Sequence, residues 1–298
     1  MLMIGNQRGS ALLVVITLVY SLFLLGLSLQ TIVGGDLERA IQFRNRTRAR
    51  FIAQAGVTTA LSILRAQPAT FTALNQGWYH QPDRFQEVSF AGGVFTVSHQ
   101  GTSGETLYGM QDEESRIHLN KAPPSLLAAL PGMNLARAEA AIRHRTGQPF
   151  ATPAEFVSWL AAQPGGLSDG EREILPRLTT VWGTGRINLN TAPAPVLLAL
   201  PGMTPERVAR LLQHRRGPDG REGTADDQPF PSLAALQEWG LIQGEEGLSW
   251  RPLVTVSSTT FSFVSRASIG RLRPATVTVH VVVQRQGKDW VVKYWKVW

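Results

Sequence analysis

The first 35 residues constrain the fold of this chain more than any other feature. They read MLMIGNQRGSALLVVITLVYSLFLLGLSLQTIVGG, and no charged residue occurs between Arg8 and Asp36. As a helix, residues 10–33 would span about 36 Å, which is enough to cross the roughly 30 Å hydrocarbon core of a bilayer. An uncharged run of this length is rare in soluble proteins. We therefore prefer a membrane-spanning helix to a buried core helix.

The short polar leader before this run leaves two kinds of processing to distinguish. A secretory signal has an apolar stretch of about 7–15 residues, followed by a small-x-small cleavage site. Here the run is longer, and its far end, GLSLQTIVGGD, holds no A-x-A site. The alternative is a cut before the run, between Gly9 and Ser10, which would leave the apolar helix on the mature protein.

The junction QRGSALLVV resembles the leader of type IV pilin-like proteins. The resemblance implies cleavage by prepilin peptidase after Gly9 and methylation of the new N-terminus at Ser10. Most pilins carry a glutamate at the fifth mature position, where this chain has Val14. That departure is shared by the minor pseudopilin K of type II secretion systems, whose place at a fibre tip leaves no earlier neighbour to contact.

The arginines around the span argue for a different orientation. Only Arg8 precedes the span, whereas five arginines follow it closely: Arg39, Arg44, Arg46, Arg48 and Arg50. The positive-inside tendency would place the C-terminal side in the cytoplasm. The pilin resemblance instead implies a single-pass inner-membrane protein with a periplasmic C-terminal domain. We expect the periplasmic orientation because long domains translocate largely regardless of charge.

Composition narrows the functional classes. The 298 residues carry 29 Lys+Arg against 22 Asp+Glu, a formal net charge of +7. This surplus makes nucleic acid or anionic lipid worth considering, but it is modest for the length. The chain has no cysteine, which excludes disulfides, thiolate metal sites and cysteine nucleophiles.

The segments after the span predict an α+β fold. Residues 36–66 contain no proline and show apolar residues near helical spacing, so the helix should continue as a stem. FQEVSFAGGVFTVSHQ and ETLYGM read as strands with a turn at Gly92–Gly93. After Ser249 the chain is again rich in strand-forming residues, with turns expected at Arg273-Pro274 and Gln286-Gly287. A long helix packed on an antiparallel sheet is the simplest arrangement.

A long helical middle interrupts the strands, and it repeats itself. RIHLNKAPPSLLAALPGMNLARAEAAIRHR begins at Arg116, and RINLNTAPAPVLLALPGMTPERVARLLQHRR begins at Arg186, an offset of 186 − 116 = 70. Such similarity indicates duplicated units. Each unit predicts an Asn/Thr-capped helix with proline in its first turn, a tight turn at Pro131-Gly132 or Pro201-Gly202, and a second helix.

These units are helix-hairpin-helix patterns, which often bind DNA phosphates through backbone N–H groups. The usual hairpin is Gly-apolar-Gly, but here the third positions are Asn134 and Thr204. A positive-φ position could accept asparagine, whereas a β-branched threonine would be strained there. We therefore favour protein–protein packing by the hairpins. A membrane-anchored DNA receptor of the ComEA type remains the alternative, although it leaves the β-rich flanks unexplained.

The strings EESRIHLNKAP and GRINLNTAP, each followed by LPGM, closely resemble the helical domain of the minor pseudopilin K family. In that family a helical domain is inserted into a pseudopilin head, and here the order of segments is the same. The resemblance implies the following division of the chain: leader 1–9, transmembrane helix 10–34, stem 35–67, first β segment 68–112, helical repeats 113–182 and 183–250, and closing β segment 251–298.

The sequence shows no catalytic constellation. It contains no H-x-x-x-H or H-E-x-x-H pair, no P-loop and no G-x-S-x-G elbow. His144 and His214 each sit late in an expected helix, where a cation would suit the helix dipole. We expect no enzymatic activity.

One loop could hold a metal. GPDGREGTADDQPF places clustered carboxylates among glycines, which suits the oxygen ligands of Ca²⁺. A solvated acidic loop is the plain alternative. Family members bind calcium in the head, so the resemblance adds weight to Ca²⁺ without assigning its ligands. The candidate ligands are Asp219, Glu222, Asp226 and Asp227.

Together these features predict a minor pseudopilin at the tip of a type II secretion pseudopilus, where it would initiate or cap assembly. The resemblance implies minor pseudopilins of the I and J types as partners, with the H type as a further candidate. It also implies contact with prepilin peptidase and the inner membrane, and no nucleic acid.

Overall fold

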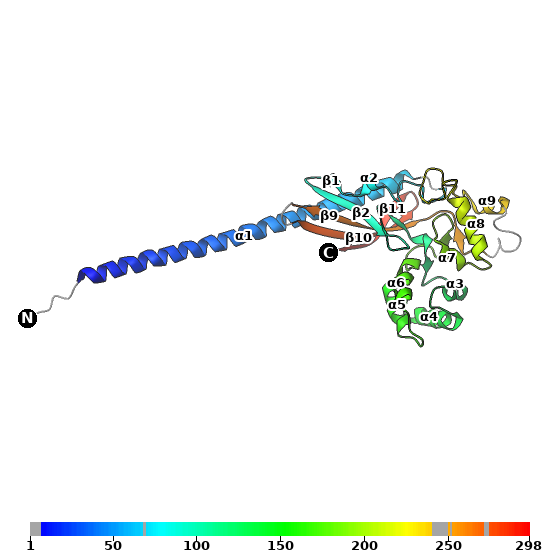
Figure 1. Cartoon of the computed structure of the whole chain (residues 1–298), viewed down its shortest axis with the longest axis horizontal. Coiled ribbons are helices and arrows are strands. Elements are labelled where there is room, and N and C mark those ends of the chain that lie inside the picture. Colours follow the sequence, from blue (N-terminus) through cyan, green and yellow to red (C-terminus); the bar gives the residue numbers. More distant parts are fainter. Residues whose placement is uncertain (1–6, 68–69, 240–249, 251, 271–273) are drawn as a thin grey trace, which may run out of the picture.

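The computed structural model describes residues 7–67, 70–239, 250, 252–270 and 274–298, with the backbone alone at 7–10 and 31–35. A single long helix, α1 (Gln7–Ala66), runs into a head made of an antiparallel sheet and a helical domain (Figure 1). The helical domain lies at the end of the head that is farthest from the free part of α1. The expected α+β architecture with an inserted helical domain is confirmed.

Helix α1 has two different surroundings. Its segment Ala11–Gln30 has a mean hydropathy of 2.6 and is entirely exposed, and it is long and apolar enough to cross a membrane. Its C-terminal third packs one face against the sheet, and that face consists of small and branched apolar side chains: Ala49, Ile52, Ala53, Val57, Ala60, Ile63 and Leu64. The helix ends at Ala66, ahead of a proline in the sequence.

The sheet is antiparallel and is built from both ends of the chain. Its strand order is β1-β2-β9-β10-β11, while β3 pairs with β2 and β4 pairs with β9. The helix α2 (Pro82–Phe85) precedes β1. The strands are β1 (Val88–Phe90), β2 (Gly93–Gln100), β3 (Thr106–Leu107), β4 (Gln111–Asp112), β9 (Thr260–Ile269), β10 (Ala275–Gln286) and β11 (Asp289–Val297).

The turn between β1 and β2 lies one residue earlier than its glycine pair suggested. Ala91 and Gly92 hold the central positions with φ of 49° and 80°, the two positive values of a tight hairpin. Gly93 instead begins β2, where an added Cβ would lie 2.6 Å from the Ser268 carbonyl oxygen and 2.7 Å from Ile52 Cδ1. Its hydrogen therefore allows the close approach of β9 and α1.

The helical domain contains both repeats, and each repeat closes on itself through a short parallel strand pair. β5 (Ile117–His118) pairs with β6 (Thr179–Thr180), and β7 (Ile187–Asn188) pairs with β8 (Val254–Thr255). The first pair encloses α3 (Pro124–Ala128), α4 (Leu135–Gly147), α5 (Pro153–Ala161) and α6 (Asp169–Leu178). The second encloses α7 (Ala194–Leu198), α8 (Pro205–Arg215) and α9 (Leu233–Glu238). One apolar core joins the two repeats.

The closest approach of α1 to the sheet yields a first prediction. A Cβ on Gly56 would clash with Ser265 Oγ and lie 2.9 Å from Phe95 Cδ2. Gly56→Ala should therefore destabilise the head by about 1–3 kcal/mol, even though alanine is the better helix former. Thermal unfolding of the full chain in detergent measures the effect.

Gly170→Ala is the matched control, since its added Cβ would have no neighbour within 4 Å in α6. It should leave stability unchanged or raise it by up to about 1 kcal/mol. An unchanged or higher melting temperature for Gly56→Ala would contradict the described packing.

Candidate functional site

In each repeat, one asparagine side chain exchanges two hydrogen bonds with the backbone of a distant residue, as a neighbouring strand would. Asn120 Nδ2 donates to the Phe150 carbonyl at 2.8 Å, and the Phe150 N–H donates back to Asn120 Oδ1 at 3.0 Å. Asn190 and Phe230 repeat the same exchange at 2.9 and 2.8 Å. The asparagine of each repeat thus ties the start of the repeat to the loop after its second helix.

An arginine reinforces the same joint in both repeats. Arg145 donates to the carbonyls of Leu119 and Ala122 at 2.5 and 2.8 Å. Arg215, seventy residues later, makes the equivalent pair of bonds at 3.0 and 2.9 Å and is only 2% exposed. The His-Arg pairs that mark the repeat in the sequence therefore have an internal structural role.

The helix caps differ from those expected. The short helices α3 and α7 begin after Pro123 and Pro193 and have no side-chain cap, so the expectation of Asn/Thr-capped first helices is wrong. The capped helices are the second ones, α4 and α8, whose N-caps are Asn134 and Thr204.

The positive φ of each hairpin falls on its glycine. Gly132 and Gly202, each after its turn proline, have φ of 69° and 74°. Asn134 and Thr204 are extended, with φ of −147° and −115°. The strain expected at Thr204 does not arise, because an N-cap requires extended backbone.

Several polar groups of the hairpins are already hydrogen-bonded within the chain. The N–H groups of Arg137 and Arg207 donate to the cap side chains at 2.9 and 3.3 Å. Arg207 Nη1 also donates to the Gly202 carbonyl at 2.9 Å, and Arg137 makes the corresponding bond to Gly132. These N–H groups already have acceptors within the chain, so they are not available to donate to a phosphate. The geometry therefore adds no support to the DNA-receptor alternative.

The histidine near the end of each second helix packs against aromatic rings. His144 lies 4.9 Å from Phe150 and 5.2 Å from Trp159 between ring centroids. His214 lies 5.2 Å from Phe230 and 4.3 Å from Trp239. Burial lowers the pKa of His214, which disfavours the cation that was expected to interact with the helix dipole.

Three consecutive carboxylates are buried where the sheet meets the helical domain. Asp112, Glu113 and Glu114 are 1%, 3% and 2% exposed. They follow β4 directly and precede the first repeat. Arg116 is the cation paired with them among the described residues, and its Nη1 lies 3.9 Å from Glu113 Oε1. Their charge is thus balanced mainly by hydrogen bonds.

Asp112 holds the second repeat. Its Oδ2 accepts bonds from Asn188 Nδ2 at 3.1 Å, from Thr191 Oγ1 at 2.5 Å and from Ser258 Oγ at 2.6 Å. Its Oδ1 accepts the N–H of Glu114 at 2.9 Å. A single carboxylate therefore joins β4, β7 and the segment that leads into β9.

The two glutamates connect the first repeat to β9. Glu113 accepts hydroxyl bonds from Thr180 in β6 and Ser262 in β9. Glu114 Oε1 accepts from Thr259 Oγ1 at 2.9 Å, and its Oε2 accepts from the Thr260 N–H at 3.1 Å. The head and both repeats are joined through this acidic segment, residues 112–114.

Burial perturbs the protonation of this segment. Burial raises the pKa of Glu114 to about 8, with the nearby Asp112 adding to the shift. Burial also raises the pKa of Asp112. The folded state therefore favours the protonated form of Glu114 at neutral pH.

The predicted calcium loop has the right donor chemistry, but its carboxylates already accept hydrogen bonds from groups of the chain, and Asp226 and Asp227 share the Thr224 hydroxyl. Glu222 Oε1 is paired with Arg215 Nη2 at 2.5 Å and Arg216 Nε at 3.3 Å. Burial would raise the pKa of Glu222, but the two arginines outweigh it and lower the pKa. Asp226 accepts the N–H of Asp219 at 3.0 Å.

Asp227 completes the set by accepting the N–H of Gly223 at 2.8 Å. Among the described residues, no group of three acidic or histidine side chains is placed around one point that could hold a metal. Ca²⁺ would therefore have to draw these carboxylates together, and Glu222 is the least available of them.

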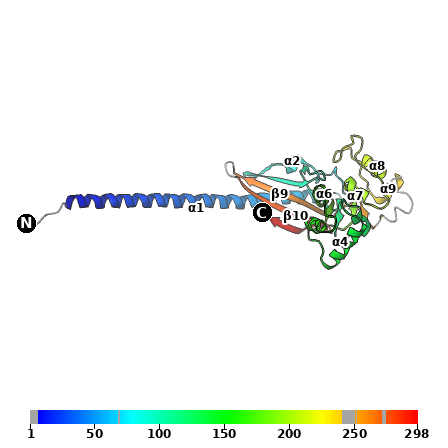
Figure 2. The ribbon, with the colours of Figure 1, turned by 60° about the horizontal axis from the view of Figure 1, so that its bottom comes forward.

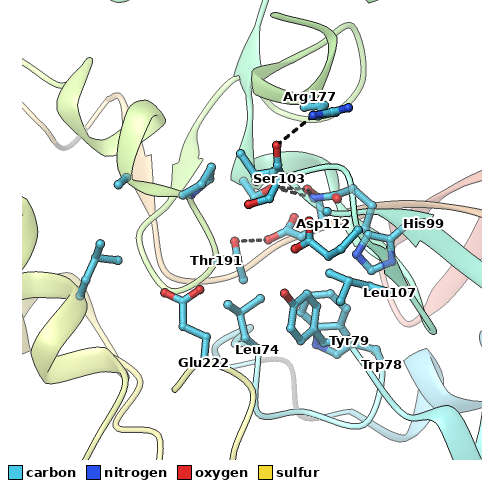
Figure 3. A pocket seen from close by; sticks show the side chains of 18 of the residues that line it. Leu74, Trp78, Tyr79, His99, Ser103, Leu107, Asp112, Arg177, Thr191 and Glu222 are labelled. Atoms are coloured by element: carbon cyan, nitrogen blue, oxygen red, sulfur yellow. Dashed lines mark hydrogen bonds between the residues drawn. The ribbon is translucent and has the colours of Figure 1, made fainter. Parts of the chain in front are cut away.

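A cavity of about 260 Å³ lies between the sheet, the acidic segment and the calcium loop (Figure 3). Tyr79 and His99 lie on one side of it, Asp112 and Thr191 on its inner wall, and Glu222 on the opposite side. Burial raises the pKa of Tyr79 to about 12 and lowers that of His99 to about 3. Both groups are therefore neutral at physiological pH and suit a packing role.

The comparisons with known proteins agree with this architecture. The chain is similar in fold to a chain of the GspK-GspI-GspJ complex from the type 2 secretion system of enterotoxigenic Escherichia coli. The TM-score is 0.59 and the identity 16%, over 87% of this chain and 99% of that chain. A family model described as type II secretion system (T2SS), protein K, matches residues 117–175 and 187–251, which are the two repeats.

The two repeats of the chain carry the type II secretion system protein K domain. No curated protein sequence matches the chain. The matched ranges contain the Asn and Arg joints of both repeats.

The expected processing residues lie at the start of the rod. Gly9 and Ser10 fall within α1, which begins at Gln7. Their side chains are outside the described part of the structure, so cleavage and methylation of this chain stay predictions. The four residues Pro131, Gly132, Pro201 and Gly202 lie in the turns between the paired helices.

Sequence reasoning missed the acidic segment of this protein. The string QDEESR was noticed only as the edge of a repeat. Its signal was present, because three consecutive carboxylates stand directly before an apolar repeat in a basic chain. Their burial depends on hydroxyl donors more than 60 residues away, such as Thr180 and Ser262.

Glu114 makes stability dependent on pH. Between about pH 4.5 and 8 the folded protein keeps a proton on Glu114 that the unfolded chain has released. The free energy of unfolding should therefore fall as pH rises through this interval. Glu114→Gln removes the titration and should flatten the dependence, as measured by chemical unfolding at several pH values.

Glu173→Gln is the control, because that carboxylate is 70% exposed at the surface. It should leave the pH dependence close to that of the wild-type chain. The same slope in the wild-type and Glu114→Gln chains would show that Glu114 is not the titrating group.

Proposed function

We propose that this protein is the tip subunit of a type II secretion pseudopilus, where it initiates or caps the fibre that drives protein export across the outer membrane. The proposal rests on where the helical domain lies relative to α1. The rod α1 leaves one end of the head, and the helical domain occupies the other (Figures 1 and 2). A further subunit stacked above would meet this domain.

The exposed rod supports a lateral assembly mode. Its described apolar side chains between Leu12 and Leu29 are 44–67% exposed, so they require lipid before assembly and other apolar helices afterwards. Val14 keeps the rod apolar where pilins carry glutamate. A tip subunit needs no such carboxylate, since no earlier N-terminus lies above it.

The proposed partners are minor pseudopilins of the I and J types, with the H type as a further candidate. The solved E. coli complex combines GspK with GspI and GspJ, and this chain shares its K-subunit fold. We place the anchor in the inner membrane and the head in the periplasm. Prepilin peptidase would cut after Gly9 and leave a methylated Ser10.

Processing at Gly9 is tested by substitution. Gly9→Leu places a bulky side chain before the scissile bond and should block removal of the leader. The precursor should then persist on a gel, and mass spectrometry should find no N-terminus at Ser10. Gly5→Leu, which changes a leader glycine away from the cut, should mature normally. A wild-type mature chain that starts beyond Gly35 would instead show a discarded export signal.

Calcium binding by the loop at 219–227 is a separate proposal. Three aspartates and one glutamate in this loop supply hard oxygen donors. Ca²⁺ bound only to the folded state would raise the melting temperature, and the rise would grow with the logarithm of the free Ca²⁺ concentration once this exceeds the dissociation constant. Melting temperatures in Ca²⁺ and in EGTA are compared for the wild-type chain and for the Asp219→Asn and Asp227→Asn variants. Asp289→Asn, which changes an exposed carboxylate elsewhere, is the control. Equal melting temperatures in the wild-type chain would exclude the site.

A further inference from the structure

The two edges of the head sheet are built differently. β1 forms one edge and has only three residues, with positive φ of 49° at both Glu87 and Ala91 beside it. β11 forms the other edge and has nine residues. Proteins commonly protect sheet edges by shortening or bending them. β1 shows both protections, whereas β11 is long and has a single irregularity, the register shift at Lys293.

The backbone of β11 offers unpaired groups at this edge. Thr278 and Trp298 exchange both backbone bonds, at 2.9 and 3.0 Å. Because bonded and non-bonded pairs alternate in an antiparallel ladder, the groups of Trp295 and Val297 point away from β10. Within the described residues, β11 pairs with β10 alone. These N–H and C=O groups are therefore free to bind another strand.

The side chains of β11 are unusually apolar for an exposed edge. Val291, Val292, Trp295 and the adjoining Trp298 are 38%, 41%, 37% and 55% exposed. Tryptophan is strongly enriched where proteins bind one another. A long apolar edge of this kind invites strand pairing.

The charge at this edge specifies the partner. Lys288, Lys293 and Lys296 lie on or beside β11, with Asp289 as the one acidic residue of the strand. An acidic segment would complement this charge. A second copy would not, because two β11 strands paired with each other would bring their lysines together.

The edge also lies beside the proposed rod contact. The C-terminal end of β11 is at the side of the head where α1 enters (Figures 1 and 2). A subunit whose rod packs along α1 would therefore have its own head next to Trp295–Trp298. The two surfaces form one continuous contact region.

We propose that an extended, acidic segment of the neighbouring minor pseudopilin adds to β11 as a further strand of the sheet. This inference rests on the proposed function for the identity of the neighbour. Main-chain bonds at the free edge supply binding, while the tryptophans and lysines select an apolar, acidic segment.

The test uses the full chain co-expressed with the I- and J-type pseudopilins of its own secretion system and purified from membranes. Val297→Pro removes one outward N–H and leaves the bonds to β10 in place, since proline is tolerated where the N–H side of an edge strand faces solvent. Val297→Ala is the matched control, because it shortens the side chain and keeps the N–H. Melting temperatures of the isolated chains report whether each variant folds.

Val297→Pro should reduce the recovered partner about tenfold, and Val297→Ala should reduce it less than about threefold. Lys293→Glu with Lys296→Glu should also lower recovery, most at low salt. Residue-resolved hydrogen exchange on the wild-type complex gives an independent measure. The amides of Trp295 and Val297 should slow on assembly, while that of Trp298, already bonded to Thr278, should not.

The outcomes separate two failures. If the wild-type chain recovers no I- or J-type subunit, the proposed function is wrong. If it recovers them but Trp295 and Val297 exchange as fast as in the free chain, the edge proposal alone is wrong. Homodimers joined through β11 would also overturn it. Should Val297→Pro not fold, the exchange measurement still decides.

Discussion

The buried acidic segment at 112–114 is the constraint on which the architecture of the head depends. A helical domain inserted into a sheet must be held at the point where the chain leaves and re-enters that sheet. Asp112 bonds the second repeat, and the two following glutamates bond the first repeat and β9. Buried carboxylates are costly unless their oxygens are satisfied. Because of this cost, the folded state favours the arrangement in which both repeats and β9 meet at these carboxylates.

This joint explains how the molecule can carry different contacts at its two ends. The rod is an exposed apolar helix suited to lipid or other rods, and the helical domain is a closed body with its own apolar core. Between them, β11 leaves one edge of the sheet unpaired within the described residues. Lateral contacts are thus available at the rod and the edge, while the far end is covered by the two repeats.

Much of the fold could be predicted from sequence periodicity and repetition. The long helix, the flanking strands and the paired hairpins follow from local patterns of apolar residues, glycine and proline. The predictions that were wrong concern side chains that can form a hydrogen bond either with a nearby residue or with a distant one. Asn120 and Asn190 read as helix caps but bond Phe150 and Phe230 instead. Local pattern cannot decide that competition.

The sequence by itself determined an apolar anchor, a stem helix, strands at both ends of the head and a duplicated helical middle. These depend on composition and spacing, which act along the chain. Only the tertiary structure decided that Asp112, Glu113 and Glu114 are buried and that β11 is an open edge. Both properties depend on which distant groups approach, since a carboxylate is satisfied, and a strand is an edge, only with respect to its neighbours in space.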